Sequence, residues 1–486
     1  MSKQISIFLC IIIILSLLTS CAGTGDISSS VSQLEYESAV PEDVRFNGET
    51  FSILSREDNA FSDPLQFEVA ADESSSDVVN QAVYERNLVV EERFGIEIKN
   101  YAIAGQYDVK DDFQTTFINS ILSGAGEYDL ILGQQAYMAE TGIQDYFTNI
   151  YDLPYLKDNL DAEYYIQDLV DELTIDGKMY YLVSDYCLTY WDNLWVMFYN
   201  KQLAENYNIE NLYDLVRNGE WTFDKLVELS RGMYNDLNGD NWPGEEDQYG
   251  FIIDIDNTPP SFFAVFDNLP TTKHDDGTVE MTVDQGKMVS ILEKFISFKQ
   301  SECVYYDSIH SNKIQDDNPL DIMFSGDRAL FYTSVLYKAR KFRSMETDFG
   351  IIPMPKWDEN QTDYYTESFD HYSVIMVPID CQNKEKAGAV IDVLSAISYS
   401  TVLPAYYDVA LKNKFARDED SAEMLDIIRE NVKVNFGLFF DSLDIARSMR
   451  VLVPQDNTNY VSFYASNEKM YNRNIKKVLE SYGNHE

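Results

Sequence analysis

Residues 50–55 read TFSILS and residues 79–98 read VNQAVYERNLVVEERFGIEI, and these two stretches decide the fold. The first is short, apolar and β-prone, and it predicts a strand. In the second, apolar residues recur at the spacing of a helix: Val79, Val83, Val90 and Phe94. Gly95 predicts the end of that helix, and the alternation at 96–98 predicts another strand. A strand, a helix and a strand in this order predict a βαβ unit of a largely parallel sheet.

The same alternation continues along the chain. A helix over 113–122 is predicted to stop at Gly124, before a buried strand at 128–133. A second lobe is predicted to begin with a strand near Trp195. Further strands are predicted at 329–332, 351–355 and 373–377, and helices at 384–398 and 421–432. The pattern predicts an α/β protein in which ligands lie beyond the carboxyl ends of the strands.

Charge excludes several classes of partner. The chain has 486 residues, with 37 Lys and Arg against 82 Asp and Glu, and a formal net charge of -45. This is the opposite of a nucleic-acid-binding surface, and it would repel an anionic substrate. The four His residues are widely spaced, so no zinc site or Ser-His-Asp arrangement is apparent from local spacing. A neutral ligand is the expectation.

The N-terminus predicts export. Lys3 precedes an apolar run from Ile5 to Leu18 that fits a signal peptide, and 18–22 read LTSCA, which resembles a bacterial lipobox. We therefore expect a signal peptide over 1–20, a lipid on Cys21 and a flexible tether over 21–45, which would hold the protein on the outer face of the cytoplasmic membrane. A plain secretory signal or short anchor is the alternative. The remaining Cys187, Cys303 and Cys381 are too few for a disulfide framework and are expected to be buried apolar residues.

Several segments together resemble the extracellular solute-binding proteins of ABC transporters, family 1, which includes the maltose-binding type. These segments are Asn80–Phe94, Tyr128–Leu132, Phe198–Lys201, Gly219–Leu226, Asp236–Phe251, Asp327–Tyr332, Gly350–Lys356 and Leu411–Ile428. The resemblance implies a two-lobed periplasmic-binding-protein-like fold (type II), whose lobes close by a hinge on a carbohydrate. It further implies a monomer, with no required cofactor, that delivers this solute to a membrane permease. We expect 46–193 with 348–400 to form lobe 1, and 194–347 with 401–486 to form lobe 2.

The resemblance also implies ligand-binding residues. Those just before the strand at Trp195 would line the cleft, with Trp191 stacking on a sugar and Asp192 and Asn193 binding hydroxyls. Burial of Trp191 in the interlobe core is the alternative. Further candidates are Arg56 after the first strand, Gln134, Gln135 and Tyr137 in a first-lobe loop, Tyr332 on the second lobe, and Tyr406 and Tyr407 in a return crossing. Core packing or surface exposure is open for each of these.

The loop at 236–247 resembles a calcium-binding loop. Oxygen ligands would come from Asp236, Asn238 and Asp240, from the backbone carbonyl of Trp242, and from Asp247. The usual Gly is replaced by Asn241, Pro243 stiffens the loop, and the last ligand is Asp instead of Glu. A structural Ca²⁺ and a turn of Asx residues without an ion both remain open.

Two rival functions remain beside solute capture. A secreted glycoside hydrolase would need two carboxylates, and the sequence singles out no pair. A surface glycan-binding protein without a transporter is the other alternative. Binding without enzymatic activity is the expectation.

Overall fold

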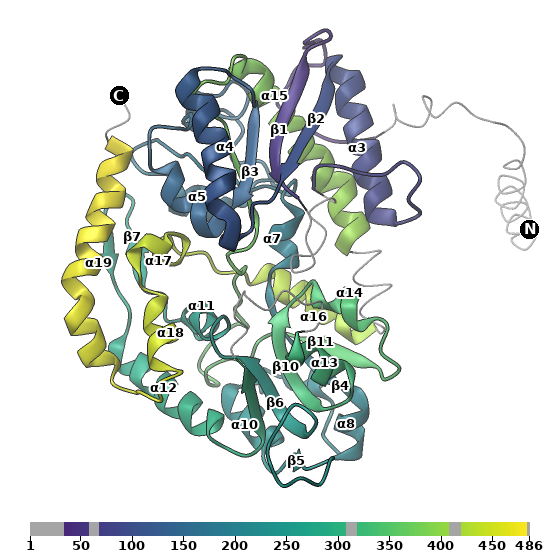
Figure 1. Ribbon diagram of the computed structural model, residues 1–486, viewed down its shortest axis with the longest axis vertical. Coiled ribbons are helices and arrows are strands. Elements are labelled where there is room, and N and C mark those ends of the chain that lie inside the picture. The colour runs from purple at the N-terminus through teal and green to yellow at the C-terminus, as the bar shows by residue number, and fades with distance from the viewer. Residues whose placement is uncertain (1–33, 58–67, 308–317, 408–418, 484–486) are drawn as a thin grey trace, which may run out of the picture. The chain divides into compact units, whose positions relative to one another are not determined.

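The first sheet contains the βαβ unit that the sequence predicts. The computed structural model describes residues 34–57, 68–307, 318–407 and 419–483 (Figure 1). The sheet has the order β12-β3-β1-β2, in which β1 is parallel to β2 and β3, and β12 is antiparallel to β3. Its strands are β1 (Thr50–Arg56), β2 (Glu97–Ile103), β3 (Leu130–Gln134) and β12 (Ser373–Met376).

Local sequence explains how the connecting helix begins and ends. The helix α3 (Val78–Phe94) starts after Asp77, whose side chain accepts hydrogen bonds from the backbone N–H groups of Val79 and Asn80. It ends at Gly95, which has a φ of 65° in the left-handed region that glycine tolerates best. The predicted strand, helix and strand are therefore confirmed.

The second sheet has six strands. Its order is β11-β4-β10-β6-β5, and β9 pairs with β6. Aromatic rings around Phe198 of β4 fill its core, with centroids 5.2 to 6.5 Å from that of Phe198. The strands are β4 (Trp195–Asn200), β5 (Tyr234–Asn235), β6 (Gln248–Asp254), β9 (Val304–Asp307), β10 (Ala329–Val335) and β11 (Phe349–Ile352).

The predicted lobe boundary at residue 348 is wrong for β11. We expected 348–400 to belong to the first lobe, yet β11 pairs antiparallel with β4, and Phe349 lies opposite Asn200. All four residues of β11 are buried, so it serves as an edge of the second sheet's core. The chain returns to the first sheet only after this strand, at β12.

The predicted tether is too long at its C-terminal end. The folded body begins at Tyr36, not at residue 46. Val40 is 4% exposed, and the Ser38 hydroxyl donates to the buried carboxylate of Asp392 at 2.7 Å. Arg93 donates to the Tyr36 hydroxyl and to the Val40 carbonyl. Residues 36–40 are thus packed on the first lobe, and the predicted signal peptide and Cys21 lie outside the described residues.

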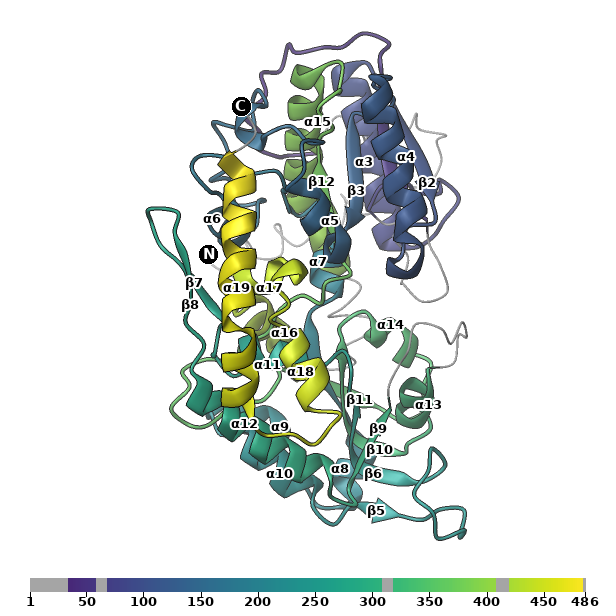
Figure 2. The ribbon, with the colours of Figure 1, turned by 60° about the vertical axis from the view of Figure 1, so that its left-hand side comes forward.

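Helices cover both sheets. The helix α15 contacts α3, and the long C-terminal α19 lies beside α12 in both views (Figures 1 and 2). The remaining principal helices are α4 (Lys110–Ser123), α5 (Gln135–Gly142), α6 (Gln167–Leu173), α7 (Leu188–Asp192), α8 (Lys201–Asn206), α9 (Leu212–Arg217), α10 (Phe223–Ser230), α11 (Phe262–Val265), α12 (Gln285–Lys299), α13 (Pro319–Ser325), α14 (Lys338–Phe342), α15 (Lys384–Ile397), α16 (Glu419–Glu430), α17 (Phe436–Phe439), α18 (Arg447–Leu452) and α19 (Tyr460–Gly483). The hairpin of β7 (Thr271–Lys273) and β8 (Val279–Met281) packs against α17 and α19.

The helix that contains α15 is longer than predicted. We expected it to end near Ser398, but it continues through the π-helical turn Ser398–Val402 as far as Tyr407. By length and hydropathy this helix could cross a membrane, yet 78% of its most apolar window is buried inside the fold. It is therefore a core helix of the first lobe.

The two sheets are joined by chain segments that run side by side. The first crossing follows α7 into β4, and the second runs from β11 to β12. Leu194 and Ser368 form an antiparallel bridge between them, flanked by a hydrogen bond from Phe369 N to Asn193 O at 2.8 Å. A third segment joins where Lys433 N donates to Thr366 O at 2.7 Å. A cavity lined by residues of both lobes lies against these crossings.

Candidate functional site

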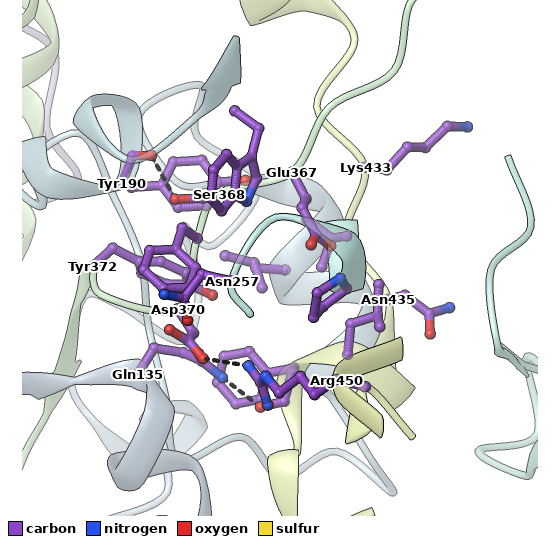
Figure 3. A pocket seen from close by; sticks show the side chains of 18 residues that line it. Gln135, Tyr190, Asn257, Glu367, Ser368, Asp370, Tyr372, Lys433, Asn435 and Arg450 are labelled. Carbon is purple, nitrogen blue, oxygen red and sulfur yellow. Dashed lines mark hydrogen bonds and ion pairs between the residues drawn. The ribbon is translucent and has the colours of Figure 1, made fainter. Parts of the chain in front are cut away.

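A cavity lies against the second crossing and receives residues from both sheets. It holds about 720 Å³ of atom-free space when the part open to solvent is counted, and its enclosed interior is much smaller. Its wall consists of Gln135, Leu169, Tyr190, Trp195, Asn257, Pro260, Glu367, Ser368, Phe369, Asp370, Tyr372, Lys433, Val434, Asn435, Leu438, Phe439, Ala446 and Arg450 (Figure 3). The location between the two sheets is that of an interlobe cleft.

Aromatic rings provide much of the apolar wall. The rings of Trp195 and Phe369 lie 5.3 Å apart, and those of Tyr190 and Tyr372 lie 5.2 Å apart, edge to face. His371 lies against Phe369, with the two ring centroids 4.2 Å apart. Tyr190, Trp195 and Tyr372 are 2 to 5% exposed and hold the wall in place, whereas Phe369 is half-buried and can offer a ring face to the C–H face of a sugar.

Polar groups are interleaved with these rings. Ser368 donates to the Tyr190 carbonyl at 2.8 Å, and Gln135 donates to the Phe439 carbonyl (Figure 3). The Asn435 amide is fixed by Thr271, to whose carbonyl it donates at 2.7 Å. Such groups have fixed positions, and their remaining donor and acceptor capacity is suited to hydroxyl groups.

Two carboxyl groups and two cations also line the cavity. The Asp370 carboxylate is paired with Arg450, whose Nη2 lies 3.8 Å away. Lys433 places its ammonium 4.0 Å from the centre of the Tyr365 ring. Burial, together with the charge of Asp370, raises the pKa of Glu367 to about 8, although Arg450 opposes the rise. Burial and the guanidinium groups of Arg56 and Arg450 lower the pKa of His371.

Gln135 is the predicted residue that reaches the cavity. It begins α5 directly after β3, at the carboxyl end of a parallel strand, which is where the sequence placed it. Its backbone N–H donates to the Tyr372 carbonyl at 2.9 Å, and the next N–H donates to the Asp370 carbonyl. These bonds tie the first-lobe loop to the second crossing.

The other first-lobe candidates lie beneath this surface. Gln134 is 1% exposed, and Tyr137 donates to the Gly105 carbonyl while packing on Phe113. Arg56 is 3% exposed and donates to the His371 carbonyl and the Ser373 hydroxyl. Arg56 therefore supports the crossing from below, and none of the three lines the cavity.

The candidates Trp191, Asp192 and Asn193 are brought together at the first crossing, beside the cavity instead of on its wall. The Trp191 indole N–H donates to Asp185 at 2.8 Å, and the Arg429 guanidinium lies 5.0 Å from its ring centre. Asn193 donates to the Thr189 carbonyl at 2.8 Å. This arrangement matches the alternative of a buried interlobe anchor.

Asp192 binds the predicted residue Tyr406. Its carboxylate pairs with Arg340 at 2.7 Å and accepts from the Tyr406 hydroxyl. Tyr407, the next candidate, donates to the Leu425 carbonyl. Both tyrosines are 1% exposed, so they link the long core helix to the crossings and to α16.

Tyr332 lies in the core of the second sheet. It is 1% exposed, donates to Asp321 at 2.9 Å and packs near Phe198. Asp321 in turn pairs with Lys338 at 2.6 Å. Tyr332 is therefore a core residue, which is one of the alternatives that the sequence left open.

The loop from Asp236 to Asp247 folds on its own hydrogen bonds. Asp236 accepts from the N–H groups of Gly239 and Asn241, and Asn238 accepts from that of Asp240. The Asp247 carboxylate is fully buried and accepts three bonds, from Leu237 N, Gly244 N and the Tyr234 hydroxyl.

The carboxylates of this loop do not converge on one point. Across the described residues, no three His, Cys, Asp or Glu side chains gather in a way that could hold a metal ion. Trp242, the predicted carbonyl ligand, has a side chain that is 76% exposed. The hydrogen bonds of the loop are those of Asx turns, and calcium binding there stays a prediction.

Much of the cavity wall was absent from the sequence prediction. The segment from Glu367 to Asp370 lies between a predicted strand at 351–355 and another at 373–377, and a connection that reads ESFD carries no motif. Asn435 and Arg450 come from C-terminal helices that approach the crossing only in the folded chain. No usable signal was available in the first case, because nothing local shows that the strands at 351–355 and 373–377 lie in different lobes.

Comparisons with known proteins identify the family and the fold. The family model described as bacterial extracellular solute-binding protein matches residues 91–396, more than half of the chain. No match is found among the curated proteins. Similar solved structures are numerous, and their identity to this chain is low.

Three solved structures illustrate the likeness. The substrate-binding protein Lmo0181 of Listeria monocytogenes, in complex with cycloalternan, has a TM-score of 0.54 at 13% identity, over 90% of this chain and 100% of its own. The galacto-N-biose/lacto-N-biose I-binding protein of Bifidobacterium longum has a TM-score of 0.55 at 12% identity, over 90% of this chain and 98% of its own. The GacH receptor of Streptomyces glaucescens has a TM-score of 0.53 at 11% identity, over 91% of this chain and 100% of its own. The predicted two-lobed α/β fold is confirmed.

Proposed function

This chain belongs to the bacterial extracellular solute-binding proteins, and from that premise we propose that it captures a sugar or oligosaccharide in the cavity between its lobes. The observation that carries the proposal is the composition of that cavity. Rings of Tyr190, Trp195, Phe369 and Tyr372 alternate there with amide, hydroxyl and carboxyl groups. Sugars present both C–H faces and hydroxyl groups, and this wall suits both.

The ligand has no anionic group in this proposal. The net charge of -45 and the carboxyl groups of Glu367 and Asp370 oppose an anion, since Arg450 is already paired with Asp370. Neutral sugars, the class expected from composition, are the first to test. The relatives named above were solved with, or named for, oligosaccharides, which supports the same class.

We further propose the cellular setting that the sequence predicts. The family places the protein outside the cytoplasm. A lipid on Cys21 would hold it at the outer face of the cytoplasmic membrane, where a monomer would deliver its solute to the permease of an ABC importer. Mass spectrometry of the mature N-terminus tests the lipid, and release of Cys21→Ala from membranes is the expected result.

A thermal-shift and calorimetric screen of neutral mono- and oligosaccharides tests ligand capture. A ligand at 100 times its dissociation constant stabilises the folded chain by about 2.7 kcal/mol. Phe369→Ala should weaken the binding of the identified sugar by about tenfold or more, because it removes a ring face from the wall. Trp242→Ala, which removes an exposed aromatic ring that does not line the cavity, is the matched control and should bind normally.

Two outcomes would contradict the proposal. No response to any sugar would favour a surface protein that binds polymeric glycans without a transporter. Turnover of an oligosaccharide would favour a hydrolase, since Glu367 and Asp370 place two carboxyl groups on one cavity wall. In that case Glu367→Gln should abolish the turnover.

A further inference from the structure

The carboxyl group of Glu367 lies on the cavity wall without a direct ion pair. Within the described part of the chain, no hydrogen bond or ion pair reaches its oxygens. The cationic side chains of the same wall are directed elsewhere. Arg450 pairs with Asp370 at 3.8 Å, and the Lys433 ammonium lies over the Tyr365 ring and points away from Glu367 (Figure 3).

The surroundings of this carboxyl group favour a cation. Phe369, which is half-buried, lines the same cavity with the more deeply buried Tyr190 and Trp195, and the face of an aromatic ring attracts a positive charge. A ring that packs on a sugar can therefore also accept an ammonium group on that sugar. A carboxylate beside such rings adds a full opposite charge in a site partly shielded from water.

A neutral sugar alone would not require this residue. Burial and the like charge of Asp370 make the ionised form of Glu367 costly in the empty cavity, and its pKa is raised for that reason. A hydroxyl group could also be bound by an amide, which carries no such cost. A ligand with an ammonium group would instead stabilise the ionised carboxylate, because it supplies a direct ion pair.

We propose that Glu367 makes the cavity selective for sugars with a free amino group, whose ammonium pairs with this carboxylate while the neighbouring rings pack on the sugar. The inference rests on the proposed function, since it assumes sugar capture in this cavity and adds the preferred chemical class. It narrows the expectation of a neutral ligand: neutral sugars of the same shape bind, but more weakly.

Matched pairs of sugars provide the test. Titration calorimetry at pH 7 would compare glucosamine with glucose, galactosamine with galactose, mannosamine with mannose, and the glucosamine disaccharide chitobiose with cellobiose. We expect the amino member of at least one pair to bind about tenfold more tightly at low ionic strength. Added salt should reduce this ratio, because it screens the ion pair.

Two variants locate the selectivity. Glu367→Gln keeps the shape of the side chain and removes its charge, so the ratio of affinities within the pair should fall toward one. Glu359→Gln removes an exposed carboxyl group of the same connection, outside the cavity, and should leave the ratio unchanged. The ratio in the unmodified protein remains decisive even if one variant folds poorly.

The outcomes separate this inference from the function on which it rests. If neutral members bind as tightly as amino members, or if Glu367→Gln keeps the ratio, the amino selectivity is wrong and sugar capture stands. If no member of any pair and no other sugar binds, sugar capture itself is wrong and the inference is rejected with it.

Discussion

Asp192 joins three parts of the chain through one carboxylate. It ends α7 at the first crossing, pairs with Arg340 of α14 at 2.7 Å, and accepts from the Tyr406 hydroxyl of the long core helix. Its side chain is 7% exposed, so removing it leaves the Arg340 guanidinium without this partner in a mostly buried place. Asp192→Ala should lower the free energy of unfolding by about 3 kcal/mol, measured by urea denaturation.

A graded pair of variants separates charge from hydrogen bonding at this position. Tyr406→Phe removes one hydrogen bond and should cost about 1 kcal/mol. Asp192→Asn keeps an acceptor for Tyr406 but loses the ion pair. Its loss of unfolding free energy should lie between those of Tyr406→Phe and Asp192→Ala. Equal stability of Asp192→Ala and the unmodified protein would show that this carboxylate does not hold the crossings together.

For single residues, the sequence predicted the place in the fold better than the groups that the side chain contacts. Gln135 was found because the carboxyl end of a buried strand is visible in sequence and marks the edge of a sheet. Trp191 lies beside the cavity but faces Asp185 and Arg429, and a helical turn at 188–192 decides which way its ring points. Glu367 carries no local signal, because its environment comes from segments distant in sequence.

At the element scale, the segment at 36–40 behaves as part of the first lobe. The Asp392 carboxylate is fully buried and accepts from Ser38, from Ala39 N and from Asn159, Tyr164 and Tyr165. A chain that begins at Glu42 loses the first two bonds and the burial of Val40. It should be less stable than one that begins at Glu35 by about 2–4 kcal/mol.

Melting curves of the two chains test this prediction. Ser38→Ala in the longer chain removes one donor to Asp392 and should produce part of the loss, about 1 kcal/mol. Ser74→Ala, which changes an exposed hydroxyl on the same lobe, is the control and should have little effect. Identical melting of the two chains would mean that residues 36–40 contribute no stability and belong to the tether after all.

The loop at 236–247 is a second element with its own test. Because Asp236 and Asp247 already accept backbone N–H bonds, the loop should form without an ion, and EDTA should not change the melting temperature. Asp247→Ala should cost about 2–3 kcal/mol with or without Ca²⁺, because it leaves buried donors unpaired. A melting temperature that falls with chelator and recovers with Ca²⁺ would instead establish the calcium site.

Elements were predictable where local pattern determines them. The unit β1-α3-β2 was correct because spacing, the cap at Asp77 and the stop at Gly95 all agree. The sheet to which β11 belongs was not predictable, since a buried strand reads as four apolar residues in either sheet and only its pairing with β4 decides. The extension of the α15 helix past Ser398 likewise depends on tertiary packing of Tyr406 and Tyr407.

On the scale of the whole molecule, buried carboxyl groups dominate the response to pH. Burial is the largest cause that raises the pKa of Glu68, of Asp254 to about 6, of Asp185 to about 7 and of Glu367 to about 8. His371 has the opposite effect. Its pKa is lowered in the folded chain, so the folded chain loses stability as the pH falls below the ordinary pKa of His. Its side chain is 45% exposed, so its effect is reduced by solvent.

The sign of the pH dependence follows from proton binding. Between the pKa of an unfolded Asp, near 3.8, and about 7, the folded chain keeps the proton of Asp185 that the unfolded chain has lost. The stability that this group contributes is therefore complete below about pH 4 and is lost as the pH rises to about 7. Glu367 extends the same trend to about 8. The protein should melt at a higher temperature at pH 5.5 than at pH 8, and its net charge of -45 acts in the same direction.

Asp185→Asn isolates one contribution to this profile. The Asn oxygen can still accept the Trp191 indole N–H, which Asp185 accepts at 2.8 Å, but it carries no charge to bury. The variant should gain stability on the order of a few kcal/mol at pH 8 and almost none at pH 4, so its melting temperature should vary less with pH. Asp158→Asn, at an exposed carboxyl group of the same lobe, should leave the profile unchanged. A melting temperature that rises from pH 5.5 to 8 in the unmodified protein would mean that these carboxyl groups are ionised and compensated in the folded chain, and the acidic cavity would then have a different charge from the one argued for Glu367.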